Sequence, residues 1–308
     1  MSKFGCLIMG PAGAGKTTFC SALIQHLQNS RRSCYYINLD PAAEDFTHTP
    51  DIDIKDLISL EDVMEEMSLG PNGGLIYCFE FLLQNLDFLT EPLESVTDEY
   101  LIVIDMPGQI ELYTHIPILP SLIKELTRGN LNIQMCAAYL MESTFVIDRP
   151  KFFAGTLSAM SAMLMLELPH VNVLSKMDLI KDSIPRRDLK RFLDPDVGLL
   201  DEDPERAARA ANADRSLVLP VAPDPEEKED MDPTKTENVM EGKSFNRLNK
   251  AVGNLINEFS MVSFLRLDVQ DENSVGAILS YIDDAIQFHE AQEPREPRDE
   301  IEGEGMEI

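Results

Sequence analysis

Positively charged residues are scarce in this chain, where 26 Lys and Arg stand against 54 Asp and Glu, a net charge of −28. This imbalance argues against a surface that coats DNA or RNA, because contacts to a phosphate backbone need clustered basic side chains. We therefore expect no direct nucleic-acid partner.

Long hydrophobic runs are also missing. No stretch reaches 18 uninterrupted apolar residues, and the richest, 159–168, already contains Ser161 and Glu167. A transmembrane helix is therefore excluded, and no membrane partner is expected. The N-terminus lacks a basic region followed by an apolar stretch and a small-residue cleavage site, so we expect a cytoplasmic rather than a secreted protein.

Cysteine is infrequent and shows no pairing pattern. The five cysteines form an odd set without a C-x-x-C pair, and most lie in apolar runs. This pattern predicts reduced thiols in the core of a cytosolic protein. The cysteines are Cys6, Cys20, Cys34, Cys78 and Cys136.

Much of the acidity is concentrated in two segments. Residues 201–242 hold 13 acids, 5 bases and 5 prolines, and residues 290–308 hold 8 acids and 2 bases. Both are poor in aromatics and interrupted by Pro or Gly, which is typical of unstructured chain. We therefore expect a single domain over 1–290, with a flexible acidic insert at 201–242, and a disordered acidic tail at 291–308.

The remaining sequence alternates between short β-rich runs and amphipathic stretches of helical length. Strands alternating with helices predict an α/β fold with a mostly parallel sheet. About 60 residues with helical character separate the second and third runs, more than a plain crossover requires. The expected strands are 4–9, 34–39, 101–105, 133–141, 171–175 and 261–267, and a helical segment is expected over 274–291.

A phosphate-binding loop is the strongest motif. Residues 10–17, GPAGAGKT, match G-x-x-x-x-G-K-[ST] at every fixed position, between an apolar strand and a helix expected at 17–27. Glycines let backbone amides surround phosphate oxygens at a helix N-terminus, Lys16 would reach the β- and γ-phosphates, and the Thr17 hydroxyl would bind Mg²⁺. The nucleotide-binding residues expected here are Gly13, Ala14, Gly15, Lys16, Thr17 and Thr18.

Two further strand ends supply carboxylates and an amide. Asp105 follows an apolar strand in DMPGQ, where it can hold Mg²⁺, and Gln109 occupies the position of the water-orienting glutamine of switch GTPases. Asp40 ends the second strand at the same sheet edge, where it can touch the Mg²⁺ shell or the attacking water. Helix N-capping by Asp40 is the alternative. The expected catalytic set therefore contains Gln109, Asp40 and Asp105, and the expected metal ligands are Thr17, Asp40 and Asp105.

The tetrapeptide SKMD closes the strand at 171–174 and points to a guanine base. The Asp178 carboxylate can accept hydrogen bonds from the ring N–H and the exocyclic amine of guanine, a donor pair that adenine lacks. The stem of Lys176 can pack over the base. Ser175, Lys176, Met177 and Asp178 are the expected base-binding residues. Residues 264–267 are the candidate for the remaining edge of the base.

Taken together, NLDPAAE (38–44), GPNGGL (70–75), DMPGQIELYTH (105–115) and SKMDL (175–179) resemble the signatures of the GPN-loop GTPases. The resemblance covers roughly 3–200 and resumes at 245–290. Residues 158–163 and 191–196 look most like one eukaryotic paralogue within that family.

The resemblance implies a P-loop α/β domain, with a helical insertion carrying the Gly-Pro-Asn loop, that dimerises around its nucleotides. It implies Mg²⁺-dependent GTP hydrolysis in which Asn72 reaches the phosphates bound by the partner subunit, either a second copy or a paralogue. It also implies a role in assembly and nuclear import of RNA polymerase II, with that enzyme's subunits or assembly factors as partners and with shuttling to the nucleus.

Two other functions are also compatible with the sequence. A P-loop kinase or transferase would need an arginine-rich lid, for which 186–191 is the one candidate after Lys176. A GTP-binding scaffold without turnover would share every binding motif and differ only at Gln109 and Asn72.

Overall fold

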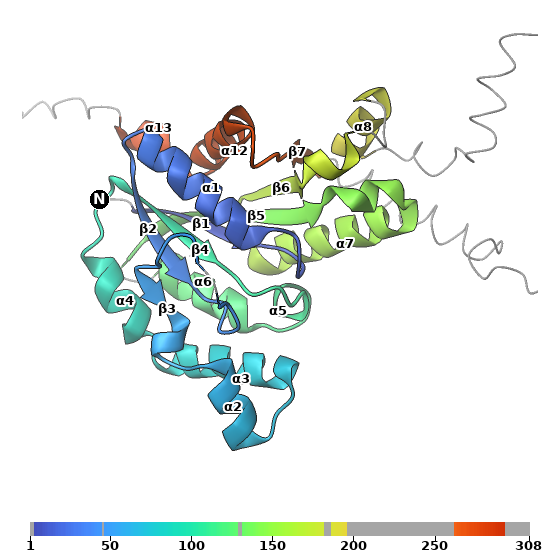
Figure 1. The fold of residues 1–308 in the computed structure, drawn as a ribbon. Coiled ribbons are helices and arrows are strands. Elements are labelled where there is room, and N and C mark those ends of the chain that lie inside the picture. The colour runs from blue at the N-terminus through green and yellow to red at the C-terminus, as the bar shows by residue number, and fades with distance from the viewer. Residues whose placement is uncertain (1–2, 45, 129–130, 182–185, 196–261, 293–308) are drawn as a thin grey trace, which may run out of the picture.

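In the part of the chain that the structure describes, seven parallel strands form one central sheet in the order β3-β2-β4-β1-β5-β6-β7 (Figure 1). The computed structural model describes residues 3–44, 46–128, 131–181, 186–195 and 262–292. The prediction of an α/β fold with a mostly parallel sheet is confirmed. The strands are β1 (Lys3–Met9), β2 (Ser33–Asn38), β3 (Ile52–Asp53), β4 (Tyr100–Asp105), β5 (Ile133–Glu142), β6 (His170–Ser175) and β7 (Phe264–Arg266).

Helices cover both faces of this sheet. Phe4, Cys6 and Ile8 of β1 pack toward α1 and the C-terminal helices, whereas Leu7 and Met9 belong to the core on the opposite face. This division follows the two-residue period of a strand. The longer helices are α1 (Lys16–Asn29), α2 (Leu60–Met67), α3 (Pro71–Gln84), α4 (Asp87–Glu94), α6 (Ile118–Arg128), α7 (Arg149–Leu166), α8 (Arg186–Leu193) and α12 (Glu272–Ala285). Shorter turns are η1 (Ile54–Asp56), α5 (Glu111–Thr114), η2 (Ser143–Ile147), η3 (Met177–Ile180) and α13 (Phe288–Gln292).

Strand register brings the carboxyl ends of the strands to one edge. Asp105 at the end of β4 lies beside Ile8 of β1 on one side and Asn38 of β2 on the other. Farther along the sheet, Ser175 at the end of β6 pairs with Glu142 of β5. Ligands of open α/β sheets bind at this edge, so the candidate residues begin close together.

The long connection between β2 and β4 is a helical insertion, as predicted. It contains β3, η1 and then α2, α3 and α4, and α2 and α3 project from the sheet on the side away from α1 and α12 (Figure 1). The two helices approach closely because residue 74 is glycine: a Cβ there would lie 2.9 Å from Leu60 Cδ1. The sequence did not indicate β3, which is two residues long and too short to show a period.

Near the C-terminus the structure differs from the prediction. The strand expected at 261–267 is shorter, because β7 spans only Phe264–Arg266. The helix expected at 274–291 is divided into α12 and α13, with Gln287 between them in the left-handed region at φ 56°. Residues 201–242 and 293–308 lie outside the described residues, so the domain boundaries, the insert and the tail stay predictions.

Cysteine burial largely follows expectation. Cys6, Cys20, Cys78 and Cys136 are buried and unbridged, whereas Cys34 is half-exposed on β2. None of the helices in the described ranges is long and apolar enough to cross a membrane.

Candidate functional site

The predicted phosphate loop connects the end of β1 to the start of α1. Gly10 has φ 141°, and a Cβ there would lie 2.2 Å from the carbonyl oxygen of Leu140 on β5. Gly13 and Gly15 also have positive φ, at 77° and 84°. The loop conformation therefore requires glycine at these positions.

Lys16 and Thr17 begin α1 and turn toward the sheet edge. Lys16 is 8% exposed, and its Nζ donates a hydrogen bond to the Pro11 carbonyl at 3.3 Å. Burial lowers the pKa of Lys16, whereas Asp105 and then Asp40 act in the opposite direction. Two carboxylates are thus near enough to stabilise the ammonium.

Asp105 is buried beside these residues. Thr17 Oγ1 donates to its Oδ2 at 2.7 Å, and the Tyr36 hydroxyl lies 3.5 Å from the same oxygen. The other oxygen, Oδ1, is buried and has no hydrogen-bond partner. Burial raises the pKa of Asp105 to about 6, against the opposing effects of the Thr17 hydrogen bond and the Lys16 charge.

This donor set fits Mg²⁺. Thr17 and Asp105 bring a hydroxyl and a carboxylate together, and the unpartnered Oδ1 leaves one hard oxygen available at the centre of the site. Magnesium binds through one or two such oxygens while keeping water and substrate phosphate in its remaining positions. Thr17 and Asp105, two of the three predicted metal ligands, therefore lie in direct contact.

Asp40 follows β2 and contributes a negative charge to the same site. Its charge acts on both Lys16 and Asp105, and its Oδ1 accepts a hydrogen bond from the Ala42 amide at 3.0 Å. The next helical turn, η1, begins at Ile54, so Asp40 closes a tight turn rather than capping a helix. It is half-buried, which leaves it accessible to water.

Gln109 is held against the phosphate loop by its neighbour. A Cβ on Gly108 would lie 2.8 Å from Ala12 Cα, so the two loops are in contact and residue 108 has no room for a side chain. Gln109 Oε1 is buried without a hydrogen-bond partner. An amide oriented here with a free acceptor suits the binding of a water.

Tyr113 belongs to the site and was not predicted. It is fully buried in α5, and its hydroxyl donates to the Pro107 carbonyl, beneath the loop that carries Gln109. Burial raises the pKa of Tyr113, which also forms a hydrogen bond with the main chain of Gly10. Tyr113 therefore links the phosphate loop to the loop that carries Gln109. The sequence offered one signal, a tyrosine at an apolar helix position four residues after Gln109.

The tetrapeptide predicted to bind a base starts with a residue that supports the phosphate loop. Ser175 is buried at the end of β6, and its Oγ donates to the Ala14 carbonyl at 2.6 Å. The serine at this position therefore ties the base-binding segment to the phosphate loop, and its side chain is not free to face a base.

Lys176 is fixed at both ends. Its backbone is left-handed, at φ 55°, and its carbonyl accepts a hydrogen bond from Ser143 Oγ at 2.7 Å. Its Nζ lies 3.4 Å from Glu142 Oε2, and its Cε would be 4.0 Å from a Cβ on Gly15. The stem thus lies over the phosphate loop, where a base plane can stack on it. Glu142 was not singled out by the sequence.

Asp178 is exposed at the start of η3. Within the described ranges its carboxylate has no hydrogen-bond partner, while the nearby Lys181 pairs with Asp268 at 2.6 Å. Buried Met177 fixes the segment, because its amide donates to the Leu267 carbonyl at 3.2 Å. The carboxylate of Asp178 is therefore free to accept hydrogen bonds from a ligand.

The candidate for the remaining base edge needs correction. Residues 264–266 form β7 and pair with β6, and the Leu267 amide donates to the Leu174 carbonyl at 2.8 Å. The main-chain groups of these residues therefore form hydrogen bonds within the sheet. The loop that follows the last strand is 267–271, directly beside Met177.

Asn72 and Thr18 are both exposed. Gly70 is the N-cap of α3 and Pro71 its first residue, so Asn72 lies in the first turn of that helix, in the α2–α3 projection (Figure 1). No contact between Asn72 and the phosphate loop is found among the described residues. Thr18 lies in the first turn of α1 with its side chain toward solvent.

Comparisons with known proteins agree with this geometry. The family model described as "Conserved hypothetical ATP binding protein" matches residues 8–288. A protein named GPN-loop GTPase 3 from Aspergillus fumigatus is 67% identical over 301 residues, covering 97% of each chain. The protein of the same name from Saccharomyces cerevisiae is 51% identical, covering 98% of this chain and 99% of its own.

A solved structure supports the fold. The apo form of a GTPase from Pyrococcus abyssi superposes with a TM-score of 0.63 at 18% identity, covering 92% of this chain and 97% of its own. With the sequence relatives aligned over nearly their whole length, and with the phosphate loop, Asp40, Asp105 and residues 175–178 all following strands at one edge of the parallel sheet, this chain belongs to the GPN-loop GTPase family.

Proposed function

We propose that this chain binds GTP with Mg²⁺ at the carboxyl edge of the sheet and hydrolyses it. One observation carries the proposal: Thr17 Oγ1 and Asp105 are 2.7 Å apart at the mouth of a glycine-shaped loop, and the second Asp105 oxygen is buried without a partner. A buried carboxylate oxygen in that state is costly unless a ligand satisfies it.

The roles of the chain's own residues follow from their positions. Lys16 places a positive charge at the β- and γ-phosphates, and the amides of the phosphate loop surround them. Thr17 and Asp105 would hold Mg²⁺, which would supply positive charge against the negative charge that develops on the phosphoryl group. Gln109 and Asp40 face this position from neighbouring loops and orient the attacking water.

Guanine selection is part of the proposal. The matching family is described as ATP-binding, whereas the relatives are named GTPases. The free carboxylate of Asp178 supports guanine, because it can accept two hydrogen bonds from that base and none of this kind from adenine. Lys176 supplies the stacking surface.

The test measures steady-state phosphate release with GTP and with ATP, in the presence and absence of Mg²⁺. We expect turnover with GTP and Mg²⁺, loss of turnover in Lys16→Ala, and no change in Lys124→Ala, whose lysine is exposed on α6. Turnover with ATP alone would overturn the base assignment. Tight GTP binding without phosphate release would favour the scaffold instead, and a nucleotide-dependent transfer to a small acceptor would favour the kinase.

The chain acts, in this proposal, as one subunit of a dimer with a second copy or a GPN-loop paralogue. Support comes from the α2–α3 connection, where Met67 and Leu69 are 49% and 37% exposed beside Asn72. Apolar side chains exposed together with a polar amide suit a packed interface. The amide of Asn72 would then reach the phosphates bound by the partner subunit.

The cellular role we propose is assembly and nuclear import of RNA polymerase II, from a cytoplasmic location with shuttling to the nucleus. Its support is the family resemblance, since fold and site geometry alone do not specify a client. Affinity purification from native cells, with the Lys16→Ala chain as control, should recover a GPN-loop paralogue and polymerase subunits near stoichiometry. Recovery of neither would remove this part of the proposal.

A further inference from the structure

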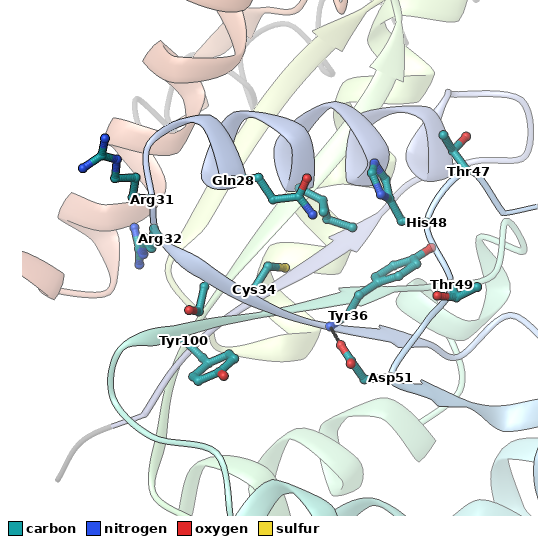
Figure 2. A pocket seen from close by; sticks show the side chains of 12 residues that line it. Gln28, Arg31, Arg32, Cys34, Tyr36, Thr47, His48, Thr49, Asp51 and Tyr100 are labelled. Atoms are coloured by element: carbon teal, nitrogen blue, oxygen red, sulfur yellow. Dashed lines mark hydrogen bonds between the residues drawn. The ribbon is translucent and has the colours of Figure 1, made fainter.

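A cavity of about 720 Å³ lies away from the phosphate loop, and no residue of that loop lines it. It is a trench between the second half of α1, the first half of β2 and residues 47–51 (Figure 2). Gln28 of α1 and His48 approach from above, Cys34 forms the floor, and Tyr36 and Asp51 close one end (Figure 2).

The trench exists because β3 is too short to cover its neighbour. β3 pairs with β2 only at Ile37 and Asn38. One residue earlier, the Asp51 side chain and amide bind the Tyr36 amide and carbonyl, each at 2.7 Å. Before Tyr36, the outer edge of β2 has no neighbouring strand among the described residues.

The main chain at this edge is available for pairing. Alternate residues of a strand direct their N–H and C=O groups to the same side, so Cys34 presents its peptide groups to the same edge as Tyr36. An uncovered strand edge is a template for an added peptide segment, with backbone hydrogen bonds giving affinity and side-chain pockets giving selectivity.

The walls of the trench favour a ligand rich in carboxylates. They present hydrogen-bond donors: the amide of Gln28, the His48 ring, and the hydroxyls of Thr47 and Thr49, while Arg31 lies at one end with its guanidinium directed outward (Figure 2). Arg31 is exposed and has no partner among the described residues.

The lining contains one carboxylate, that of Asp51, and the Tyr36 amide already occupies it. In a chain of net charge −28, this excess of donors selects an acidic peptide.

The C-terminal segment of the chain has the matching chemistry. Residues 293–308 contain seven acids and two arginines, and Ile301 lies between Glu300 and Glu302. The apolar side chain of Ile301 suits the floor formed by Cys34 and Ile24, while flanking carboxylates suit the donors on the walls.

The helix that precedes this segment, α13, lies beside one end of the trench. Its Phe288 ring lies 3.6 Å from Cζ of Arg32, a lining residue held by Asp283 at 2.7 Å. Five helical residues span about 7 Å, and 16 extended residues reach about 50 Å, so the trench is within range.

The acidic insert is a poorer match by position. It follows α8, which packs on β7 at the opposite end of the sheet from β2.

We propose that residues 293–308 bind in the trench along β2, pairing with its free edge and placing acidic side chains against Arg31 and His48. The contact closes an exposed strand edge, and tethering gives it an effective concentration near the millimolar range.

Cys34 provides the test, because it lies on the trench floor and the other four cysteines are buried. Its alkylation by a maleimide is measured in the full chain at pH 8.5, with Cys34→Ser as background; burial raises the pKa of this thiol to about 12, so labelling is slow enough to follow. Reversing the tail charges (Asp299→Lys, Glu300→Lys and Glu302→Lys together) should accelerate labelling at least threefold.

Arg31→Glu should have the same effect, and combining it with the reversed tail should restore protection. Arg128→Glu, a change on exposed α6, should leave the rate unchanged. A synthetic peptide of residues 293–308 added to the reversed-tail chain should slow labelling again, with protection weakening in 0.5 M NaCl because exposed charge pairs are screened.

Equal labelling rates in the parent and both charge variants, together with no effect of the peptide, would overturn the proposal. Protection by a peptide of residues 201–242 but not by 293–308 would overturn it in favour of the insert. Protection by inorganic phosphate alone would reduce the trench to an anion site. Because no readout depends on nucleotide, failure here leaves the proposed GTP hydrolysis unaffected.

Discussion

The phosphate-binding edge and the start of α3 carry the two most recognisable motifs. The two regions differ in how many contacts the rest of the same chain makes to the motif residues. At the edge, three hydrogen bonds hold the phosphate loop, residues 105–113 and the end of β6 in place: Thr17 to Asp105, Ser175 to Ala14, and Tyr113 to Pro107. At the start of α3, Asn72 and the residues before it are exposed.

The difference indicates two kinds of constraint. Groups at the edge are placed by the sheet, so their geometry exists before a ligand binds. The Gly-Pro-Asn turn is placed only by its helix, and its neighbours Met67 and Leu69 leave apolar surface uncovered. We infer that the first region binds nucleotide in a single subunit and the second requires a partner.

The largest expected effect comes from breaking the self-contained region. Lys16→Ala removes the only buried ammonium described at the edge. We expect hydrolysis to fall about 10²–10³-fold, since fixed charges aimed at the transition state contribute on that scale. Steady-state phosphate release measures the loss, with Lys124→Ala as control. A fall of less than tenfold would show that the loop amides suffice.

Asp105→Asn should separate catalysis from stability. Hydrolysis should fall about 10²-fold because the metal loses its carboxylate. The apo protein should become more stable at pH 8, by about 2–3 kcal/mol, because the folded pKa of about 6 exceeds the unfolded value of 3.8 and the charged form is penalised by burial.

The sign can be checked with pH. A carboxyl whose pKa is raised on folding adds stability below pH 3.8 and loses that contribution as pH rises toward 6. The gain from Asp105→Asn, measured by denaturant unfolding, should therefore vanish near pH 4. Parent hydrolysis should also fall below pH 6, since metal binding needs the deprotonated carboxylate. A gain independent of pH would contradict the assignment, and Glu99→Gln is the exposed control.

Asp178→Asn should alter base choice with little effect on stability, because the side chain is exposed. Hydrogen bonds to a charged group contribute about 1.5–3 kcal/mol, so the preference for GTP over ATP should fall roughly 10–100-fold. Competition binding measures it, with Asp194→Asn as control. Equal affinity of the parent for both nucleotides would refute the role of Asp178.

The smallest expected effect is at Glu142. Its ion pair with Lys176 is 3.4 Å long and the lysine side chain is 37% exposed, so Glu142→Gln should weaken GTP binding only about two- to fivefold. A double-mutant cycle with Lys176→Met should give less than the sum of the single effects if Glu142 acts by positioning Lys176. Additive effects would show that the two residues act independently.

Local sequence predicted the parts of the site that follow a strand end. The phosphate loop, Asp40, Asp105 and Asp178 stand directly after apolar runs, so knowing the strands placed them at one edge. Thr17 and Asp105 are 88 positions apart, and their contact follows from strand order. Strand pairing with the right-handed crossover rule makes that order predictable.

Residues that act through tertiary contacts were harder to find. Tyr113 supports two loops from a buried helix face, and Glu142 holds Lys176 across neighbouring strands. In the sequence, Tyr113 is indistinguishable from an ordinary core residue and Glu142 from an ordinary surface residue. β3 was invisible because two residues carry no period. The segment 264–267 was misplaced by a few residues, because hydrophobicity alone does not show where a strand ends and its loop begins.

Complementation between two inactive subunits tests whether Asn72 from a partner completes the phosphate edge. One subunit carries Lys16→Ala and the other Asn72→Ala, in a homodimer or with the matching changes in a paralogue. Each variant alone should hydrolyse GTP at least tenfold more slowly than the parent, while Asn72→Ala keeps parental GTP affinity and melting temperature. Glu65→Ala on α2 should match the parent.

If Asn72 acts across the interface, mixed dimers should recover hydrolysis at one site per dimer, because the intact nucleotide site then faces an intact asparagine. Native mass spectrometry confirms that mixed dimers have formed. Mixed dimers no more active than the separate variants would contradict the claim and leave residues 70–72 as a helix-starting turn.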